Sequence, residues 1–149
     1  MIRVTRQTDY AIRVILALAK RPLELRTSTS TIQREMLIPQ ALLQRIVAEL
    51  AKNGYIDTQP GRDGGLKLAH LPEEITLLQI VEAFEGPIYI SDCLEDASTC
   101  PFETRCPVNH RWERLRSLMV EELKRTTFDE LAKESNIMDN NKIDFYGGT

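Results

Sequence analysis

Two short predicted helices joined by a tight turn are the feature that most restricts the fold of this chain. A Ser/Thr-rich stretch from Thr27 to Thr31 offers several N-caps for a short helix through Ile32 to Met36. After the turn residues Leu37-Ile38-Pro39, a second helix is predicted from Gln40 to Asn53, ended by Gly54 as a left-handed cap. Its apolar residues fall on one stripe: Leu43, Ile46, Val47 and Leu50. This arrangement predicts a helix-turn-helix.

A predicted β-hairpin follows directly. The sequence from Tyr55 to Thr58 alternates like a strand, residues 60–65 are turn formers, and Leu66 to Ala69 returns. The glycine-rich turn lacks both the Walker spacing and a following helix, which argues against a nucleotide-binding loop. The expected fold is therefore mainly α with a small β-hairpin, a winged helix-turn-helix domain over residues 1–86. Two further helices of this domain are expected to be capped by Thr8 and Thr76.

The back half is expected to hold one long helix. After Cys106-Pro107 the sequence keeps a helical pattern to about Lys124. Its apolar positions approximate a heptad repeat: Val108, Trp112, Leu115, Met119 and Leu123. Pairing with a second copy of the chain and packing within one core explain this pattern equally well. Thr127-x-x-Glu130 is a capping box before a short last helix, and the polar sequence from Ser135 onward predicts disorder.

These patterns divide the chain behind the winged helix into three parts. They are a cysteine loop over residues 87–107, a long dimerisation helix with a short C-terminal helix over 108–134, and a disordered tail over 135–149.

The net charge is −3, but Met1 to His70 has eleven Lys/Arg against six Asp/Glu, and the remainder has eight against sixteen. Only the basic front half is expected to meet a polyanion, although chance clustering on solvated faces gives the same totals.

Five polar side chains are the candidate contacts to double-stranded DNA. Gln40, Gln44 and Arg45 lie near the start of the second helix, where side chains can pair with purine edges and phosphates in the major groove. Arg62 and Lys67 lie on or beside the wing, facing phosphates or the minor groove. Ordinary solvated surface is the alternative for each. Helix-turn-helix proteins usually read two half-sites, so a homodimer on a palindromic operator is expected.

Three cysteines, Cys93, Cys100 and Cys106, collect in one short loop, and the chain has no others. Their odd number excludes a fully paired disulfide framework. No signal peptide or bilayer-length apolar run is recognised, so a cytoplasmic protein without a membrane partner is expected. Three thiolates suit an iron–sulfur cluster or zinc, although gaps of six and five residues are wide for structural zinc. The two histidines, His70 and His110, belong to no recognisable acid–base motif, so an enzyme is not expected.

Several short motifs together carry a resemblance to a known family. They are Thr8-Asp9-Tyr10-Ala11, Leu50 to Ile56, Gly64 to Leu68, Cys93-x6-Cys100-x5-Cys106 and Thr127 to Leu131. From Thr5 to about Lys133 the chain resembles the Rrf-type family of winged-helix transcription regulators, in the iron–sulfur cluster-binding branch that includes IscR, NsrR and RirA. The resemblance implies a homodimeric, bacterial DNA-binding regulator that senses nitric oxide, redox state or iron and cluster status.

The resemblance also implies the ligands of the cluster. The three cysteines would bind the iron, and Asp9 of the partner subunit matches the aspartate that NsrR-type proteins use as a fourth ligand. His110 is the alternative, because IscR carries a histidine three residues after its last cysteine, where this chain has Asn109 and then His110. A 4Fe-4S cluster is favoured over a 2Fe-2S cluster.

Two points of the resemblance leave other outcomes open. Pro60 stands where IscR has an arginine in the wing, which makes Arg62 the nearest substitute for a minor-groove contact. The alternative function is a regulator of the same fold without a cluster, controlled by zinc, by thiol oxidation or by a partner protein.

Overall fold

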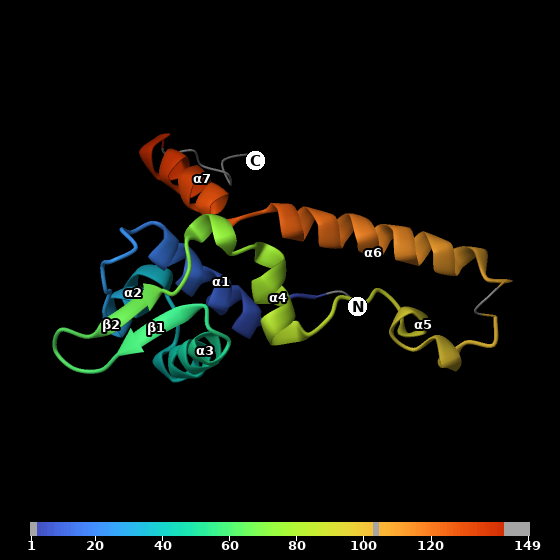
Figure 1. Cartoon of the computed structure of the whole chain (residues 1–149), viewed down its shortest axis with the longest axis horizontal. Helices are drawn as coiled ribbons and strands as arrows, with labels where there is room; N and C mark the ends of the chain where they lie inside the picture. The colour runs from blue at the N-terminus through green and yellow to red at the C-terminus, as the bar shows by residue number, and fades with distance from the viewer. Residues whose placement is uncertain (1–2, 103–104, 142–149) are drawn as a thin grey trace, which may run out of the picture.

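A head and an arm make up the structure (Figure 1). The computed structural model describes residues 3–102 and 105–141. The head consists of α1 Arg6–Ala19, α2 Thr29–Met36, α3 Gln40–Lys52, β1 Ile56–Gln59, β2 Gly65–Leu68, the 3-10 turn η1 Pro72–Glu74 and α4 Leu77–Glu85. The arm holds α5 Asp92–Glu95, the 3-10 turn η2 Ala97–Thr99 and α6 Pro107–Arg125, and the last helix, α7 Phe128–Asn141, returns to the head. The predicted mainly helical fold with one small hairpin is confirmed.

Helix α1 lies at the centre of the head and packs against α2, α3, α4 and α7. Its buried apolar residues are Ala11, Val14, Ile15, Ala17 and Leu18. They meet one buried layer contributed by the surrounding helices: Ile32, Leu43, Ile46, Leu50, Ile80 and Phe128. Each large side chain buried in this way stabilises the fold by roughly 1.5–3 kcal/mol. The head therefore closes a complete hydrophobic core within one chain.

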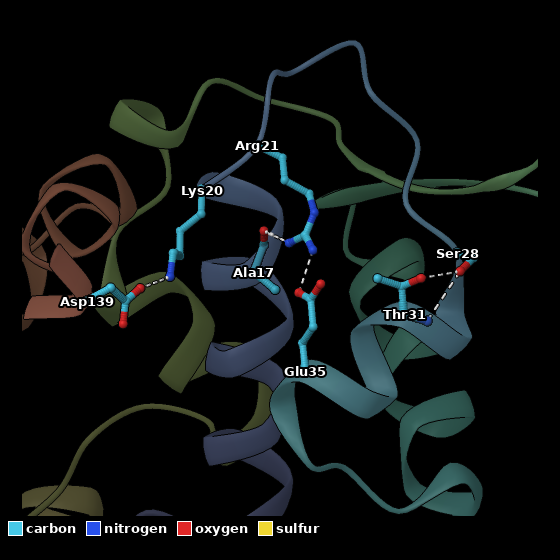
Figure 2. Close-up of polar contacts among 7 residues, drawn as sticks. All are labelled: Ala17, Lys20, Arg21, Ser28, Thr31, Glu35 and Asp139. Atoms are coloured by element: carbon cyan, nitrogen blue, oxygen red, sulfur yellow. Dashed lines mark hydrogen bonds and ion pairs between the residues drawn. The ribbon is translucent and has the colours of Figure 1, made fainter. Parts of the chain in front are cut away.

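The helix-turn-helix forms as its capping residues predict. Ser28 caps α2 by accepting a hydrogen bond from the Thr31 N–H at 3.2 Å (Figure 2). Helix α2 ends at Leu37, whose backbone is left-handed at φ 53°, a conformation that costs a leucine roughly 1–2 kcal/mol. Helix α3 ends before Gly54, which takes the expected positive φ of 79°.

The hairpin is fastened to the segment that precedes α2. Strands β1 and β2 pair antiparallel, with Ile56 opposite Leu68 and Gln59 opposite Gly65. Thr27 adds one antiparallel bridge to Leu66. A Cβ atom on Gly65, whose φ is 135°, would lie 2.5 Å from the Thr27 carbonyl oxygen, so this close approach requires glycine. The Arg26 guanidinium, next to Thr27 in the chain, pairs with the carboxylate of Asp57 on β1 at 2.5 Å, so this segment is bonded to both strands.

The start of α1 differs from the prediction. Thr5, rather than Thr8, is the N-cap, because the helix begins three residues earlier and the Thr5 hydroxyl accepts from the Thr8 N–H at 3.4 Å. Thr8 is fully buried in the first turn, and its hydroxyl donates to the carboxylate of Glu85 at the end of α4. Thr76 caps α4 as predicted, in a capping box with Gln79.

Helix α7 is longer than predicted. The capping box of Thr127 and Glu130 starts it as expected, but the helix continues past Ser135 to Asn141, so residues 135–141 of the predicted disordered tail are helical. The reason is a contact with the head: α7 packs on α1, and Lys20 Nζ lies 2.7 Å from Asp139 Oδ2 (Figure 2). Residues 142–149 of the predicted tail lie outside the described residues.

A second polar contact in the same view ties the end of α1 to α2. Arg21 donates to the Ala17 carbonyl at 2.6 Å and pairs with Glu35 (Figure 2).

None of the helices in the described part of the chain is both long enough and apolar enough to cross a membrane.

Candidate nucleic-acid interface and cysteine segment

The first half of α3, the wing and the start of α2 surround one connected depression. Gln44 and Arg62 line a cleft of about 510 Å³ between α3 and the hairpin, together with Ser28 and Thr29. A neighbouring hollow of about 380 Å³ is lined by Gln40 and again by Gln44 and Thr29. The amides of α3 and the guanidinium of the wing therefore border the same surface, which offers hydrogen-bond donors and acceptors and a positive charge to a duplex.

The other two predicted DNA contacts lie apart from that depression. Arg45 lines a separate hollow of about 220 Å³ with Gln7, Glu49 and Phe84, because one residue turns a side chain by roughly 100° around a helix. Lys67 is half-buried on β2, and its Nζ lies 3.4 Å from Glu24 Oε2. Gln40, Gln44 and Arg62 are thus brought together, whereas Arg45 and Lys67 are not.

Sequence reasoning missed the polar start of α2 as part of this surface. Ser28 and Thr29 line the larger cleft, and Thr29, Ser30 and Gln33 line the smaller hollow. The Ser/Thr-rich stretch was visible in the sequence, but it was interpreted only as a source of N-caps for the helix. The first N–H groups and hydroxyls of a helix can donate to phosphate oxygens, so this stretch is a further candidate contact to a duplex.

The three cysteines lie on what we call the cysteine segment, residues 87–106, which joins α4 to the start of α6 at the far end of the arm (Figure 1). Cys93, Cys100 and Cys106 are free thiols and half-buried. Cys93 Sγ lies 3.1 Å from Ser91 Oγ and accepts from Asn109 Nδ2 at 3.6 Å. Three half-buried thiols without a disulfide partner provide a soft donor set of the kind that binds iron or zinc.

One chain does not gather that donor set by itself. Among residues 3–102 and 105–141, no three His, Cys, Asp or Glu side chains lie close enough to share a metal ion. Asp9 is in the first turn of α1 within the head, 2.8 Å from Arg13, while the cysteines are on the arm. His110 is exposed, and its neighbour Asn109 donates a hydrogen bond to Cys93.

Two carboxylates, Asp96 on the cysteine segment and Glu85 at the end of α4, accept hydrogen bonds from hydroxyl groups. The Ser98 hydroxyl and N–H both donate to Asp96, which lowers the pKa of that carboxyl. At the joint between head and arm, burial acts to raise the pKa of Glu85, but the hydrogen bonds from Thr8 and Thr5 together outweigh it, and the pKa lies below its ordinary value. Glu85 is therefore ionised at neutral pH and clamps the start of α1 to the end of α4.

Helix α6 buries none of its residues in the single chain. Its predicted apolar stripe divides: Met119 and Leu123 face a small hollow beside α4, while Val108, Trp112 and Leu115 stay 38–48% exposed. Leu118 adds to this exposed apolar surface at 56%. Packing within one core therefore accounts for only part of the pattern.

Comparison with known proteins gives consistent matches over most of the chain. Residues 4–134 match the sequence model of the family Rrf2, described as an iron-dependent transcriptional regulator. Protein aau3 of Rhizobium meliloti is 29% identical over 133 residues, 89% of this chain and 86% of that protein. The HTH-type transcriptional regulator NsrR of Halalkalibacterium halodurans is 32% identical over 106 residues, 70% of this chain and 73% of that protein.

Solved structures agree with the sequence matches. CymR, the global cysteine regulator of B. subtilis, superposes with a TM-score of 0.76 at 28% identity, over 90% of this chain and 98% of that one. IscR of T. potens superposes with a TM-score of 0.70 over 99% of this chain and 94% of that one. At 21% identity, the likeness to IscR is one of fold alone.

Proposed function

The chain belongs to the Rrf2 family of transcription regulators, and we propose that it acts as a homodimer whose DNA affinity depends on an iron–sulfur cluster. The observation that carries the proposal is the set of three free, half-buried thiols on the cysteine segment, which the fold of the head does not need. The description of the family as iron-dependent supports iron as the metal.

The proposed ligands are Cys93, Cys100 and Cys106 with Asp9 of the partner subunit, His110 being the alternative. Within one chain Asp9 lies on α1 in the head and the three thiols lie on the arm, so Asp9 is proposed as a ligand from the partner subunit rather than from the same chain. Such a centre supplies a site that nitric oxide, oxygen or iron depletion can attack. We favour four irons over two.

The proposed dimer is supported by the exposed apolar side of α6. This side of the helix leaves four large apolar side chains exposed to solvent: Val108, Trp112, Leu115 and Leu118. An exposed apolar patch of this kind is typical of a protein–protein contact. Pairing two such helices would set the distance between two recognition helices, which a palindromic operator with half-sites one DNA turn apart requires.

The residues of this chain connect the cysteine segment to the DNA-reading surface by two routes. The first is Glu85, which accepts hydrogen bonds from the start of α1. Glu85 lies only six residues before Ser91, the N-cap of α5 in the cysteine segment. The second runs across the proposed dimer, because Asp9 lies in that same start of α1 and is the proposed ligand of the cluster on the other subunit. A change in the segment's position is therefore expected to move α1, and α1 packs directly on α2 and α3.

The decisive measurement is the iron and acid-labile sulfide content per chain, with the visible spectrum, of protein purified without oxygen. We expect about four of each, and a Cys93→Ala, Cys100→Ala or Cys106→Ala variant that loses both the iron and the metal-dependent change in DNA affinity. Ser98→Ala, on the same segment, is the matched control and should retain the iron. About two of each would favour the smaller cluster and His110.

A colourless protein that takes up no iron on reconstitution would contradict the cluster and leave the regulator without it. Zinc content, thiol oxidation and partner-protein binding would then be tested in that order. The DNA-binding role does not depend on this outcome.

A further inference from the structure

One side of α3 faces the cleft and the neighbouring hollow, and none of its side chains there is charged. We call it the reading face: Gln40, Gln44, Val47, Ala48 and Ala51. These residues are three or four positions apart along the helix, which places them on one side of it. The two glutamines are exposed and Val47 is half-buried. The face therefore begins with two amides and continues with small apolar groups.

The charged side chains of α3 lie elsewhere. Arg45 and Glu49 line the separate hollow beside α4. Among the described residues that line the cleft and the neighbouring hollow, Arg62 on the wing is the one charged side chain. A duplex on this surface would therefore meet amides, hydroxyls and apolar groups at α3, and a positive charge only at the wing.

This combination of side chains selects among base pairs. Guanine is read most often by Arg or Lys, and the amino group of cytosine by Asp or Glu, and the reading face has none of these. A glutamine amide matches the N6 donor and N7 acceptor of adenine, and an apolar side chain packs against the C5-methyl group of thymine. The reading face thus fits A·T pairs and offers no charged partner to G·C pairs.

The wing gives a second, independent reason for A·T pairs. Arg62 forms no ion pair within the described structure, whereas Lys67 on β2 is paired with Glu24. Runs of A·T pairs have a narrow minor groove with an enhanced negative potential, which attracts an inserted arginine. Arg62 lines the same cleft as Gln44, so it is available beside the base pairs that α3 reads.

We propose that the half-site read by this chain is a run of A·T pairs. Gln40 and Gln44 bind adenine edges in the major groove, Val47 packs against a thymine methyl group, and the guanidinium of the wing enters the minor groove beside them. The rise from Gln40 to Val47 is about 10 Å, the length of about three base pairs. This inference rests on the DNA-reading part of the proposed function and does not involve the cluster.

Selection from a random duplex pool, with the full-length protein purified without oxygen, tests the base preference. Gln44→Ala and Val47→Ala, selected in parallel, locate the base pairs that the reading face contacts, because the preference relaxes there. We expect A·T pairs at those positions. G·C pairs there would overturn this inference and leave DNA reading intact, whereas no enrichment of any sequence would overturn DNA reading as well.

Deoxyuridine in place of thymidine tests Val47, because this change removes only the C5-methyl group. We expect the substituted duplex to bind the unsubstituted chain about fourfold more weakly, the effect of one buried methyl group, and to bind Val47→Ala with no such loss. Leu42→Ala is the matched control: Leu42 is half-buried on the same helix and lines neither hollow, so the loss should persist. An equal loss in Val47→Ala would overturn the contact.

Adenine contacts are tested with 7-deazaadenine, which lacks the N7 acceptor, and with an exposed residue whose replacement leaves the core untouched. The modified base should weaken binding of the unsubstituted chain about fivefold and leave Gln44→Ala unaffected, since its amide is already gone. Gln7→Ala is the matched control, because Gln7 faces the other hollow with Arg45 and should keep the full loss. A fivefold loss that Gln44→Ala and Gln40→Ala both retain would refute the adenine contacts.

Discussion

The head and the arm of this molecule differ in how far each buries its apolar side chains. In the head, α1 alone buries Ala11, Val14, Ile15, Ala17 and Leu18 at no more than 3% exposure. In the arm, the nineteen residues of α6 bury none. A helix of that length with an exposed apolar side is stable in water chiefly when a second surface covers it. The head thus buries its apolar residues within one chain, whereas α6 packs on α4 and leaves part of its apolar side exposed.

Removing a core side chain from the head should have the largest effect on the free energy of unfolding. Leu43→Ala deletes a fully buried side chain between α3 and α1, and we expect a loss of about 2–5 kcal/mol in chemical denaturation. Leu118→Ala is the matched control on the arm, where the side chain is 56% exposed. Equal losses in the two variants at a concentration where the chain is monomeric would remove the distinction between the regions.

A charge on the exposed side of α6 should weaken the proposed dimer without unfolding the head. Leu115→Asp is expected to raise the dimer dissociation constant about a hundredfold, about 2.7 kcal/mol, because a carboxylate would have to be desolvated. Sedimentation equilibrium measures this change. Ser117→Asp adds the same charge at another exposed position of the same helix, about 160° around its axis from Leu115. If both variants weaken the dimer equally, net charge rather than this apolar surface controls association.

The joint between the regions depends on Glu85. Glu85→Ala leaves the buried hydroxyl of Thr8 without its carboxylate partner, and we expect a loss of about 1–2 kcal/mol at pH 7 in urea unfolding. The folded-state pKa of Glu85 lies below its ordinary value of 4.5, so the stabilisation is present above that pH and is lost as the pH falls through the lowered pKa.

The pH dependence separates this clamp from a general effect of removing a glutamate. The difference in stability between the original chain and Glu85→Ala should shrink below about pH 4. Glu82→Ala, one turn earlier on α4 and exposed, should show a smaller difference throughout. A constant Glu85 difference between pH 7 and pH 3 would mean that packing, rather than ionisation, holds α1 to α4.

The head was the more predictable region because its signals are local. Ser28, Gly54 and Thr76 mark helix ends by their own backbone preferences, and the structure places helix ends at all three. Thr8 was misassigned because its partner, Glu85, is 77 residues away in the sequence. Arg45 was grouped with Gln44 because both start the same helix, whereas only the surrounding α1 and α4 decide which hollow each one lines.

The arm was predictable in its elements but not in what it binds. The long helix after Pro107 forms as expected, and the structure divides its apolar stripe between α4 and solvent. Among the described residues no three candidate metal ligands lie together, and the predicted ligands Cys93, Cys100, Cys106 and Asp9 stay a prediction. The helix beyond Ser135 was missed because its support includes a contact that is distant in the sequence, that of Asp139 with Lys20 at the end of α1.

The smallest predicted change is a gain in stability at the root of the wing. Thr27 is 7% exposed, and its hydroxyl has no hydrogen-bond partner within the described structure, although its backbone pairs with Leu66. Thr27→Val replaces that hydroxyl with a methyl group of similar size, so we expect about 1 kcal/mol more stability in urea unfolding. Thr27→Ser keeps the hydroxyl and loses the methyl, and it should destabilise. A loss of stability in Thr27→Val would mean that the hydroxyl has a hydrogen-bond partner, most simply a buried water. The polar groups of the head would then depend on water as well as on the chain itself for their hydrogen bonds.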